Sequence, residues 1–337
     1  MRCYRAAVAP DRRVPTLADV ARHAGVHPAT VSRTLSRPEL VAPATRAAVL
    51  AAVEALGFEP NLPARQLARG RTDAIGVVVP DITNPYFAAI VRAVQRSAHD
   101  LDLAVLIADT DGDPAAEARA LATLARQVDG IVAVTPTSEP DAGRVPVVQV
   151  NRRSRRTPSV VVDQRAVVDL ALDHLAALGH RRIAVVRGPG TYWSAARRDR
   201  AVEQRAERTP RPKLRLDPIG PVPPTFAGGV DAFAAATQRS TAVVAFNDLQ
   251  AAGLVVAAHR AGVAVPDACS VIGSDGLDIA AMTAPGLTTV AAPLDALGDI
   301  AVEQLGALLR GEAARGVVTL TPTLVERHST AAPPRTR

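Results

Sequence analysis

The strongest constraint on the fold is an alternation of short Val/Ile-rich runs with longer amphipathic segments, which begins at Ile75. The short runs are typical of buried strands and the amphipathic segments are typical of helices. Strands that alternate with helices in this way predict a parallel sheet covered by helices. Because the pattern begins again at Val160, we expect two doubly wound parallel sheets, one in each lobe of a two-lobed domain.

The carboxyl ends of the predicted strands define a candidate ligand site. The predicted strands cover residues 75–79, 104–108, 131–134, 147–150, 183–186, 242–245 and 271–273. The predicted helices cover residues 85–101, 115–126, 165–178, 195–207, 229–237 and 249–261. A ligand of such folds lies beyond the carboxyl ends of the strands, here between the lobes. The side chains that follow strands, and so qualify as candidates, are Asp81, residues 84–87, Asn151, Asn247, Asp248 and Asp275.

The basic excess of the chain lies in its first fifth. The first 72 residues hold 11 arginines and 5 acidic residues, whereas the remaining residues hold 28 basic and 28 acidic side chains. A basic segment attached to a neutral domain is typical of a segment that binds a polyanion such as DNA. A solvated basic tail is the alternative that composition leaves open.

Several other classes of protein are disfavoured. No apolar run approaches the ~20 residues that span a bilayer, and the arginines of residues 1–15 precede no apolar stretch. We therefore expect a cytoplasmic, nucleoid-associated protein without a membrane partner. Cys3 and Cys269 belong to no metal or disulfide motif, so no metal or cofactor is expected. No motif of nucleophilic, phosphate-binding or zinc-dependent catalysis is present, which argues against an enzyme.

The basic segment has the pattern of a helix-turn-helix. Thr16 and Asp19 form a capping box ahead of an apolar stripe, and Gly25 is a typical helix stop. His27 and Pro28 then occupy the N-cap and first-turn positions of a second helix. A third apolar stripe follows and ends at another glycine. Two short helices joined by a glycine-containing turn, with a third to close the core, predict this DNA-binding motif.

The second helix of the motif would read the DNA. In such units it enters the major groove, where its first turns reach the base edges. Arg33 can bind guanine through two hydrogen bonds, whereas Thr30 and Ser32 are suited to phosphates. The candidates on the reading side are His27, Pro28, Ala29, Ser32 and Arg33. An ordinary helical hairpin with Arg33 on its surface is the alternative for these residues taken alone.

These motifs closely resemble the N-terminus of the lactose-repressor/galactose-repressor (LacI-type) family of bacterial transcriptional regulators. The matching segments are residues 16–21, 24–26, 30–33, 56–61 and 64–72. The resemblance implies a hinge helix, capped by Asn61, that folds on the operator and inserts Leu67 into the minor groove. It also implies a homodimer on a pseudo-palindromic duplex. The DNA contacts implied are Thr16, His27, Pro28, Ala29, Thr30, Ser32, Arg33, Asn61, Leu67 and Ala68.

The same resemblance runs through the rest of the chain, to about residue 327, and implies a periplasmic-binding-protein-like domain. The segments that carry it are residues 81–87, 145–148, 179–184, 246–248 and 285–290. The effector contacts it implies are Tyr86, Phe87, Asn151, Arg198, Asn247 and Asp275. Trp193 could add a ring above a sugar, or else it is a packing residue. Asn151 replaces a common aspartate and residues 198–202 depart from the family pattern, so an atypical sugar, a nucleoside or another small polar metabolite stays open.

The sequence thus predicts a repressor whose operator affinity is controlled by a small polar effector, with a sugar favoured. The expected parts are a disordered basic extension (1–15), a helix-turn-helix domain (16–60), a hinge (61–72), a two-lobed effector-binding and dimerisation domain (73–328) and a disordered tail (329–337). The alternative is a solute-binding protein of a transport system, which shares the two-lobed fold. Such a protein needs an export signal and has no use for a helix-turn-helix.

Overall fold

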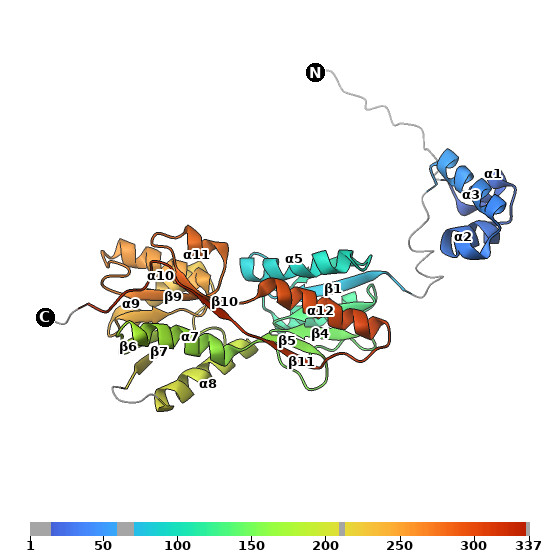
Figure 1. Cartoon of the computed structure of the whole chain (residues 1–337). Coiled ribbons are helices and arrows are strands. Elements are labelled where there is room, and N and C mark those ends of the chain that lie inside the picture. The colour runs from blue at the N-terminus through green and yellow to red at the C-terminus, as the bar shows by residue number, and fades with distance from the viewer. Residues whose placement is uncertain (1–14, 59–70, 209–212, 335–337) are drawn as a thin grey trace, which may run out of the picture. The chain divides into compact units, whose positions relative to one another are not determined.

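The computed structural model describes residues 15–58, 71–208 and 213–334. The chain divides into two compact units, residues 1–72 and 73–337 (Figure 1). The expected extension, apart from Pro15, and residues 61–70 of the expected hinge lie outside the described residues. No helix in the described ranges is long and apolar enough to cross a membrane.

The first unit is a small bundle of helices. Its elements are α1 (Leu17–Ala24), α2 (Pro28–Ser36), a short 3₁₀ turn (Pro38–Leu40) and α3 (Pro43–Leu56). Gly25 and Gly57 end α1 and α3 in the left-handed conformation, with φ of 66° and 58°, which glycine adopts without strain. The buried core is formed by Val20, Ala21, Val31, Val49, Ala52 and Phe58. The predicted helix-turn-helix is therefore present.

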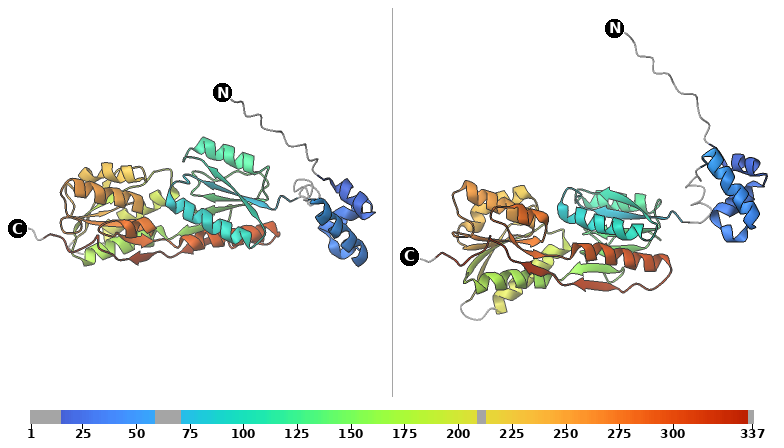
Figure 2. Two further views of the ribbon diagram at one scale, coloured as in Figure 1. Left: turned by 90° about the horizontal axis from the view of Figure 1, so that it is seen from above. Right: turned by 45° about the horizontal axis from the view of Figure 1, so that its top comes forward.

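The second unit contains two six-stranded sheets, one in each lobe (Figures 1 and 2). The first sheet has the order β11-β5-β4-β3-β1-β2 and is parallel throughout. Its strands are β1 (Ala74–Val79), β2 (Ala104–Asp109), β3 (Gly130–Val134), β4 (Val147–Val150), β5 (Ser159–Val162) and β11 (Val317–Leu320). The helices of this lobe are α5 (Pro85–His99), α6 (Pro114–Leu124) and α12 (Leu294–Leu309).

The second sheet has the order β12-β10-β9-β8-β6-β7, in which β12 alone runs antiparallel to its neighbour. Its strands are β6 (Arg182–Val186), β7 (Arg215–Ile219), β8 (Ala242–Val244), β9 (Ser270–Asp275), β10 (Thr288–Ala291) and β12 (Thr323–Val325). The helices of this lobe are α7 (Gln164–Ala177), α8 (Trp193–Arg208), α9 (Phe226–Thr237), α10 (Asp248–Arg260) and α11 (Asp278–Met282).

Helices cover both faces of each sheet, and alternate side chains of a strand pack against the helices on one face or the other. In β1, Val77 and Val79 join a core with α5 and α12, while Val78 joins a separate core with α6. In the second sheet, Ile183 faces α7 and α8, whereas Ala184 faces α9 and α10. Because successive side chains of a strand point to opposite faces, a run that is apolar at every position is buried on both sides.

The strands and helices predicted from Ile75 onward are all present, with ends shifted by up to three residues, but the division between lobes differs from the prediction. We expected the second series to begin at Val160, whereas β5 pairs with β4 and β11 in the first sheet. The chain crosses between lobes three times, after β5, after β10 and after β11. The C-terminal segment therefore extends over both lobes (Figure 2). Local patterning predicts a strand but does not select its sheet.

The expected disorder of residues 329–337 is wrong for the start of this segment. Ser329 is fully buried, accepts a 2.8 Å hydrogen bond from the Thr288 amide and donates to the Val271 carbonyl. Ala331 follows, and its amide donates to the Ser270 hydroxyl. These long-range hydrogen bonds fix the segment to the second sheet. The polar, proline-containing composition of residues 329–337 did not predict these hydrogen bonds.

Candidate ligand pocket and DNA-binding helices

The exposed side of α2, with the cap of this helix, presents the side chains expected to read DNA. The His27 ring accepts a 3.2 Å hydrogen bond at Nδ1 from the Ala29 amide and so caps the helix. Val31 and Thr34 point into the core, which leaves the opposite side of the helix exposed. The exposed residues on this helix and its cap include His27, Pro28, Ala29, Ser32 and Arg33, with Thr30 partly buried. The exposed side of α2 thus carries one arginine, Arg33, near the middle of the helix.

Thr16 serves first as the cap of α1. Its hydroxyl donates to the Asp19 carboxylate at 2.6 Å, and the Asp19 amide donates back to the Thr16 oxygen at 3.4 Å. The Thr16 hydroxyl and the Thr16 amide, which donates to the same carboxylate at 2.9 Å, together with the nearby Arg22 guanidinium, lower the pKa of Asp19 to about 2. The capping box predicted from the sequence is therefore formed. The other expected DNA contacts, Asn61, Leu67 and Ala68, lie outside the described residues.

Six of the seven residues expected to bind the effector line one pocket between the lobes. Tyr86 and Phe87 begin α5 and Asn151 follows β4 in the first lobe. Arg198 lies in α8, Asn247 precedes α10 and Asp275 ends β9 in the second lobe. The remaining lining residues are Asn84, Thr135, Gln164, Tyr192, Ser194, Pro224 and Phe246. The carboxyl ends of both sheets therefore meet at this pocket, as the parallel topology requires.

On the first lobe, Asn151 is held by Tyr86. Its side-chain nitrogen donates to the Tyr86 oxygen at 2.7 Å and lies 3.4 Å from the Thr135 hydroxyl. Its side-chain oxygen is buried and has no hydrogen-bond partner among the described residues. Burial, with the charge of Asp275, raises the pKa of Tyr86, so its hydroxyl keeps its proton at neutral pH. The first-lobe wall of the pocket therefore presents two groups to a ligand: the Asn151 side-chain oxygen, which can accept a hydrogen bond, and the Tyr86 hydroxyl.

On the second lobe, Arg198 is fixed from two directions. Its Nε donates to the Gln164 side chain at 2.7 Å and its Nη1 donates to the Phe246 carbonyl at 2.5 Å, while its guanidinium lies 4.7 Å from the Phe246 ring centre. Burial lowers its pKa and the charge of Asp275 opposes this effect. The Phe246 ring packs close to Gly188, where an added Cβ would approach it to 2.6 Å. A rigid, pre-oriented guanidinium results.

Asp275 is the acidic group of the pocket. It is buried, and burial together with nearby Asp248 raises its pKa well above the ordinary value, while Arg198 acts in the opposite direction. Its carboxylate forms no hydrogen bond to the described residues. Its backbone φ is 118°, a conformation that costs a non-glycine residue energy and that occurs preferentially at binding sites. The end of β9 thus holds a carboxylate whose oxygens can accept hydrogen bonds from a ligand.

Asn247 and Asp248 have structural partners. Asn247 donates to the Pro224 carbonyl at 2.8 Å and caps α10 by accepting from the Gln250 amide at 2.8 Å. Asp248 accepts from the Thr289 hydroxyl at 2.6 Å and from the Leu277 amide at 2.8 Å. Burial raises the pKa of Asp248 to about 6, although these two hydrogen bonds act to lower it. Both residues therefore support the second wall, and Asn247 alone lines the pocket.

Trp193 is not in the pocket. It lines a separate hollow with Arg197, whose guanidinium lies 5.2 Å from the indole centre. The aromatic residue in the pocket is its neighbour Tyr192, which meets the Phe87 ring edge-on at 6.5 Å. Successive residues at a helix start point in directions about 100° apart, so one of the pair turns inward. The two adjacent aromatic residues at the start of α8 indicated that a ring would line the pocket, but our prediction chose Trp193 instead of Tyr192.

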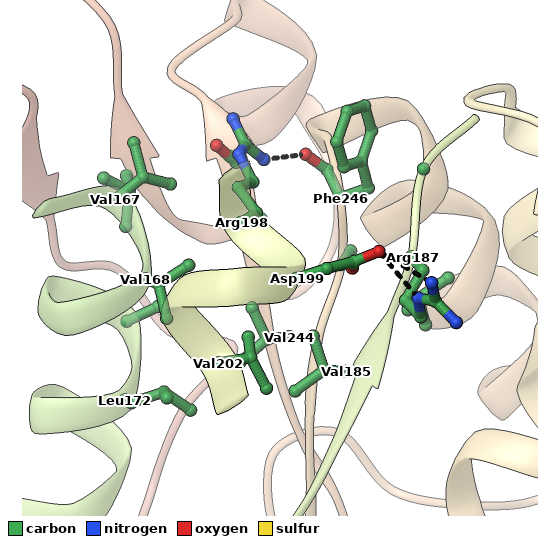
Figure 3. A pocket seen from close by; sticks show the side chains of 17 residues that line it. Val167, Val168, Leu172, Val185, Arg187, Arg198, Asp199, Val202, Val244 and Phe246 are labelled. Atoms are coloured by element: carbon green, nitrogen blue, oxygen red, sulfur yellow. Dashed lines mark hydrogen bonds and ion pairs between the residues drawn. The ribbon is translucent and has the colours of Figure 1, made fainter. Parts of the chain in front are cut away.

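An apolar cavity, drawn in Figure 3, adjoins the pocket and shares Arg198 and Phe246 with it. Val167, Val168 and Leu172 of α7 line it with Val202 of α8, and Arg198 lies at its border with the pocket. Other members of its lining are Val185, Val244, Phe246 and the Arg187–Asp199 ion pair, which spans 2.7 Å. The guanidinium therefore separates an apolar interior from a polar ligand space.

Comparison with known proteins agrees with this architecture. Residues 16–61 match bacterial regulatory proteins of the lacI family, and residues 172–330 match the periplasmic binding protein-like domain. The HTH-type transcriptional regulator DegA of Bacillus subtilis (strain 168) is 32% identical over 332 residues, 94% of this chain and 98% of DegA.

Two solved structures are similar over most of their length. The Lac repressor dimer bound to operator and the anti-inducer ONPF is 29% identical, with a TM-score of 0.82 over 94% of this chain and 99% of that chain. A LacI family transcriptional regulator from Arthrobacter sp. FB24, in complex with lactose, is 28% identical, with a TM-score of 0.68 over 76% and 98%. The chain therefore belongs to the lacI family of bacterial regulatory proteins and is a DNA-binding transcriptional regulator.

Proposed function

We propose that this regulator is a repressor whose operator affinity is controlled by a sugar bound in the pocket between its lobes. The observation that carries the proposal is the convergence of side chains from both lobes around polar groups that have no hydrogen-bond partner among the described residues. These groups are the Asn151 side-chain oxygen, which is fully buried, and the carboxylate of the buried residue Asp275, to which no side-chain hydrogen bond is formed within the described ranges. A buried polar group without a partner is costly, and a ligand that supplies hydrogen bonds removes that cost.

The chemistry of the pocket favours a polyol. Asp275 accepts hydroxyl protons, Arg198 donates to ring or hydroxyl oxygens, and the rings of Tyr86, Tyr192 and Phe246 cover apolar C–H faces. The described lining holds one acidic and one basic side chain, Asp275 and Arg198, so it offers a hydroxyl acceptor beside a donor, as an uncharged polar ligand requires. The bound lactose of the Arthrobacter regulator supports this assignment.

Ligand binding would control DNA affinity through the angle between the lobes. A sugar that contacts Asn151 in one lobe and Arg198 and Asp275 in the other stabilises one arrangement of the lobes over another. Only this difference in affinity can shift the equilibrium. A coupling free energy of about 1–3 kcal/mol changes operator affinity roughly 5- to 150-fold.

DNA recognition is assigned to the exposed side of α2. Arg33 would bind a guanine edge in the major groove, while Ser32 and Thr30 hold phosphates. Each chain would read one half-site, so the active form is a homodimer on a pseudo-palindromic operator. Leu67, from the hinge, would wedge between base pairs at the centre of that operator. The Lac repressor dimer on its operator supports this arrangement.

The test is a thermal-shift screen of the full chain against monosaccharides, disaccharides and nucleosides. A specific ligand raises the melting temperature through its preferential binding to the folded state. We expect at least one sugar to raise it in the wild type and in Trp193→Phe, a matched variant outside the pocket, but not in Asp275→Ala. Stabilisation by nucleosides alone, or an unchanged sugar response in Asp275→Ala, would overturn the assignment.

A further inference from the structure

A second polar groove, outside the pocket, is strongly basic. Two adjoining hollows share Arg153 and Arg197 in their linings. The arginines that line one or both are Arg153, Arg155, Arg156, Arg165, Arg197 and Arg200, whereas Asp163 is the only acidic lining residue. We call this surface the arginine groove. Its charge stands out because the chain beyond residue 72 is neutral as a whole.

The charges of the groove are not neutralised by neighbouring carboxylates. Arg165 pairs with Asp169 at 3.3 Å, but the other five arginines form no ion pair or side-chain hydrogen bond within the described ranges. Those five side chains are exposed. The Asp163 carboxylate is already used, because it accepts hydrogen bonds from the amides of Arg165 and Ala166 at the start of α7. The groove therefore presents an excess of free guanidinium groups.

The groove lies where the chain crosses between the lobes. Arg153, Arg155 and Arg156 belong to the segment between β4 and β5 of the first lobe, while Arg197 and Arg200 belong to α8 of the second. Val162 and Gln164, on either side of the first crossing, line it as well. Positive charges from both lobes thus face one hollow, and an anion placed there would contact both lobes.

We propose that the arginine groove binds a small molecule carrying two or more phosphate groups, as a site separate from the sugar pocket. Guanidinium groups form paired, charge-assisted hydrogen bonds with phosphate oxygens, and several arginines in one hollow match a multiply charged ligand. Trp193, beside Arg197, adds an aromatic wall for the remainder of the molecule. Because both lobes contribute arginines, the bound anion offsets their mutual repulsion and favours the lobe arrangement that brings them together.

The fluorescence of Trp193 provides a direct test, since it is the only tryptophan of the sequence. The full chain is titrated with inorganic pyrophosphate at constant ionic strength, and the heat of binding is measured in parallel. We expect a saturable change of emission in the wild type. We expect at least a tenfold weaker affinity, by heat, in Arg153→Ala and in Arg197→Ala, one from each lobe. Arg239→Ala, an exposed arginine between α9 and β8 outside both hollows, is the matched control and should bind like the wild type.

Three results would overturn the proposal. The first is the absence of saturable binding in the wild type, and the second is equal affinity in the wild type and in both groove variants. The third is an Arg153-dependent response to non-operator duplex DNA but not to pyrophosphate, which would make the groove a DNA contact. Asp275→Asn separates this site from the sugar pocket, because Asp275 lines the pocket but neither hollow of the groove. The variant should leave pyrophosphate affinity unchanged, whereas tighter binding after removal of this acidic group would place the anion in the pocket.

Discussion

The side-chain nitrogen of Asn151 donates a 2.7 Å hydrogen bond to the phenolic oxygen of Tyr86, which joins two polar first-lobe residues of the pocket. This contact uses the nitrogen of the amide, and the amide oxygen is buried with no hydrogen-bond partner in the part of the chain that the structure describes. The pocket is thus prepared on this side to receive a hydroxyl proton. An aspartate would offer a second charge next to Asp275, whereas asparagine keeps the first-lobe wall neutral.

Removing the Asn151 side chain should weaken ligand binding. The residue has a φ of 60°, so glycine is the suitable replacement, since alanine would add left-handed strain to the loss of the amide. We expect Asn151→Gly to lower sugar affinity about tenfold, or roughly 1.4 kcal/mol, measured by titration calorimetry. Tyr86→Phe, which keeps the ring and frees the amide, should have a smaller effect. Equal affinity in Asn151→Gly and the wild type would show that the amide does not contact the ligand.

Arg33 should determine base preference. It is exposed on α2, and a guanidinium that grips a guanine edge contributes about 1–3 kcal/mol to discrimination. Arg33→Ala should therefore reduce operator affinity while affinity for non-operator DNA changes little. The measurement is fluorescence anisotropy with both duplexes at a fixed salt concentration, because salt alters all such affinities. A parallel loss on both duplexes would mean that Arg33 contacts phosphates.

The pocket could be predicted from sequence because parallel strands bring their carboxyl ends together. Asn151 and Asp275 each follow a Val/Ile-rich run, and this position alone predicts that they line a common site. The position of Arg198, in a helix, came from family resemblance. The resemblance also selected Tyr86 and Phe87 from residues 84–87, which position alone had made candidates. The distinction between Tyr192 and Trp193 depends on the rotation of α8 about its axis, which two adjacent aromatic residues do not define.

The division of the chain into lobes could not be predicted in the same way. β5 is a four-residue strand whose apolar character fits either sheet, and one of its two partners, β11, lies more than 150 residues away in sequence. The burial of Ser329 has the same origin, because its partners Val271 and Thr288 belong to strands far upstream. Local patterns carry no record of such long-range pairing.

Asp248 should make the stability of the protein depend on pH. Burial raises its pKa to about 6 in the folded state from an ordinary value of 3.8, so the folded state binds the proton more tightly than the unfolded state. The free energy of unfolding should therefore rise as the pH falls from about 7 towards 4, and the gain is lost as the pH rises through the folded pKa. Asp248→Asn mimics the protonated form and can still bond to Thr289.

Urea unfolding of wild type and Asp248→Asn at pH 7 and pH 5 provides the measurement. Other groups titrate in both proteins, so the informative quantity is the difference between them. The variant should gain less stability than the wild type when the pH is lowered. If the two proteins respond equally, Asp248 is ionised throughout this range and its hydrogen bonds outweigh its burial.

Arg198 and Asp275 should be required for the ligand response but not for DNA binding itself. Both lie in the second lobe, in a unit separate from the helix-turn-helix, so neither can contribute a base contact from α2. We expect Arg198→Ala and Asp275→Ala to bind operator without ligand as the wild type does, and to lose the change in affinity that the sugar causes. Operator titrations with and without the sugar, on wild type and both variants, measure this change in affinity directly.

Because Arg198 also holds Gln164 and Phe246 in place, Asp275→Asn, which keeps the volume of the side chain, separates loss of binding from loss of packing. A full sugar response in all three variants would show that the regulatory ligand binds elsewhere on the protein.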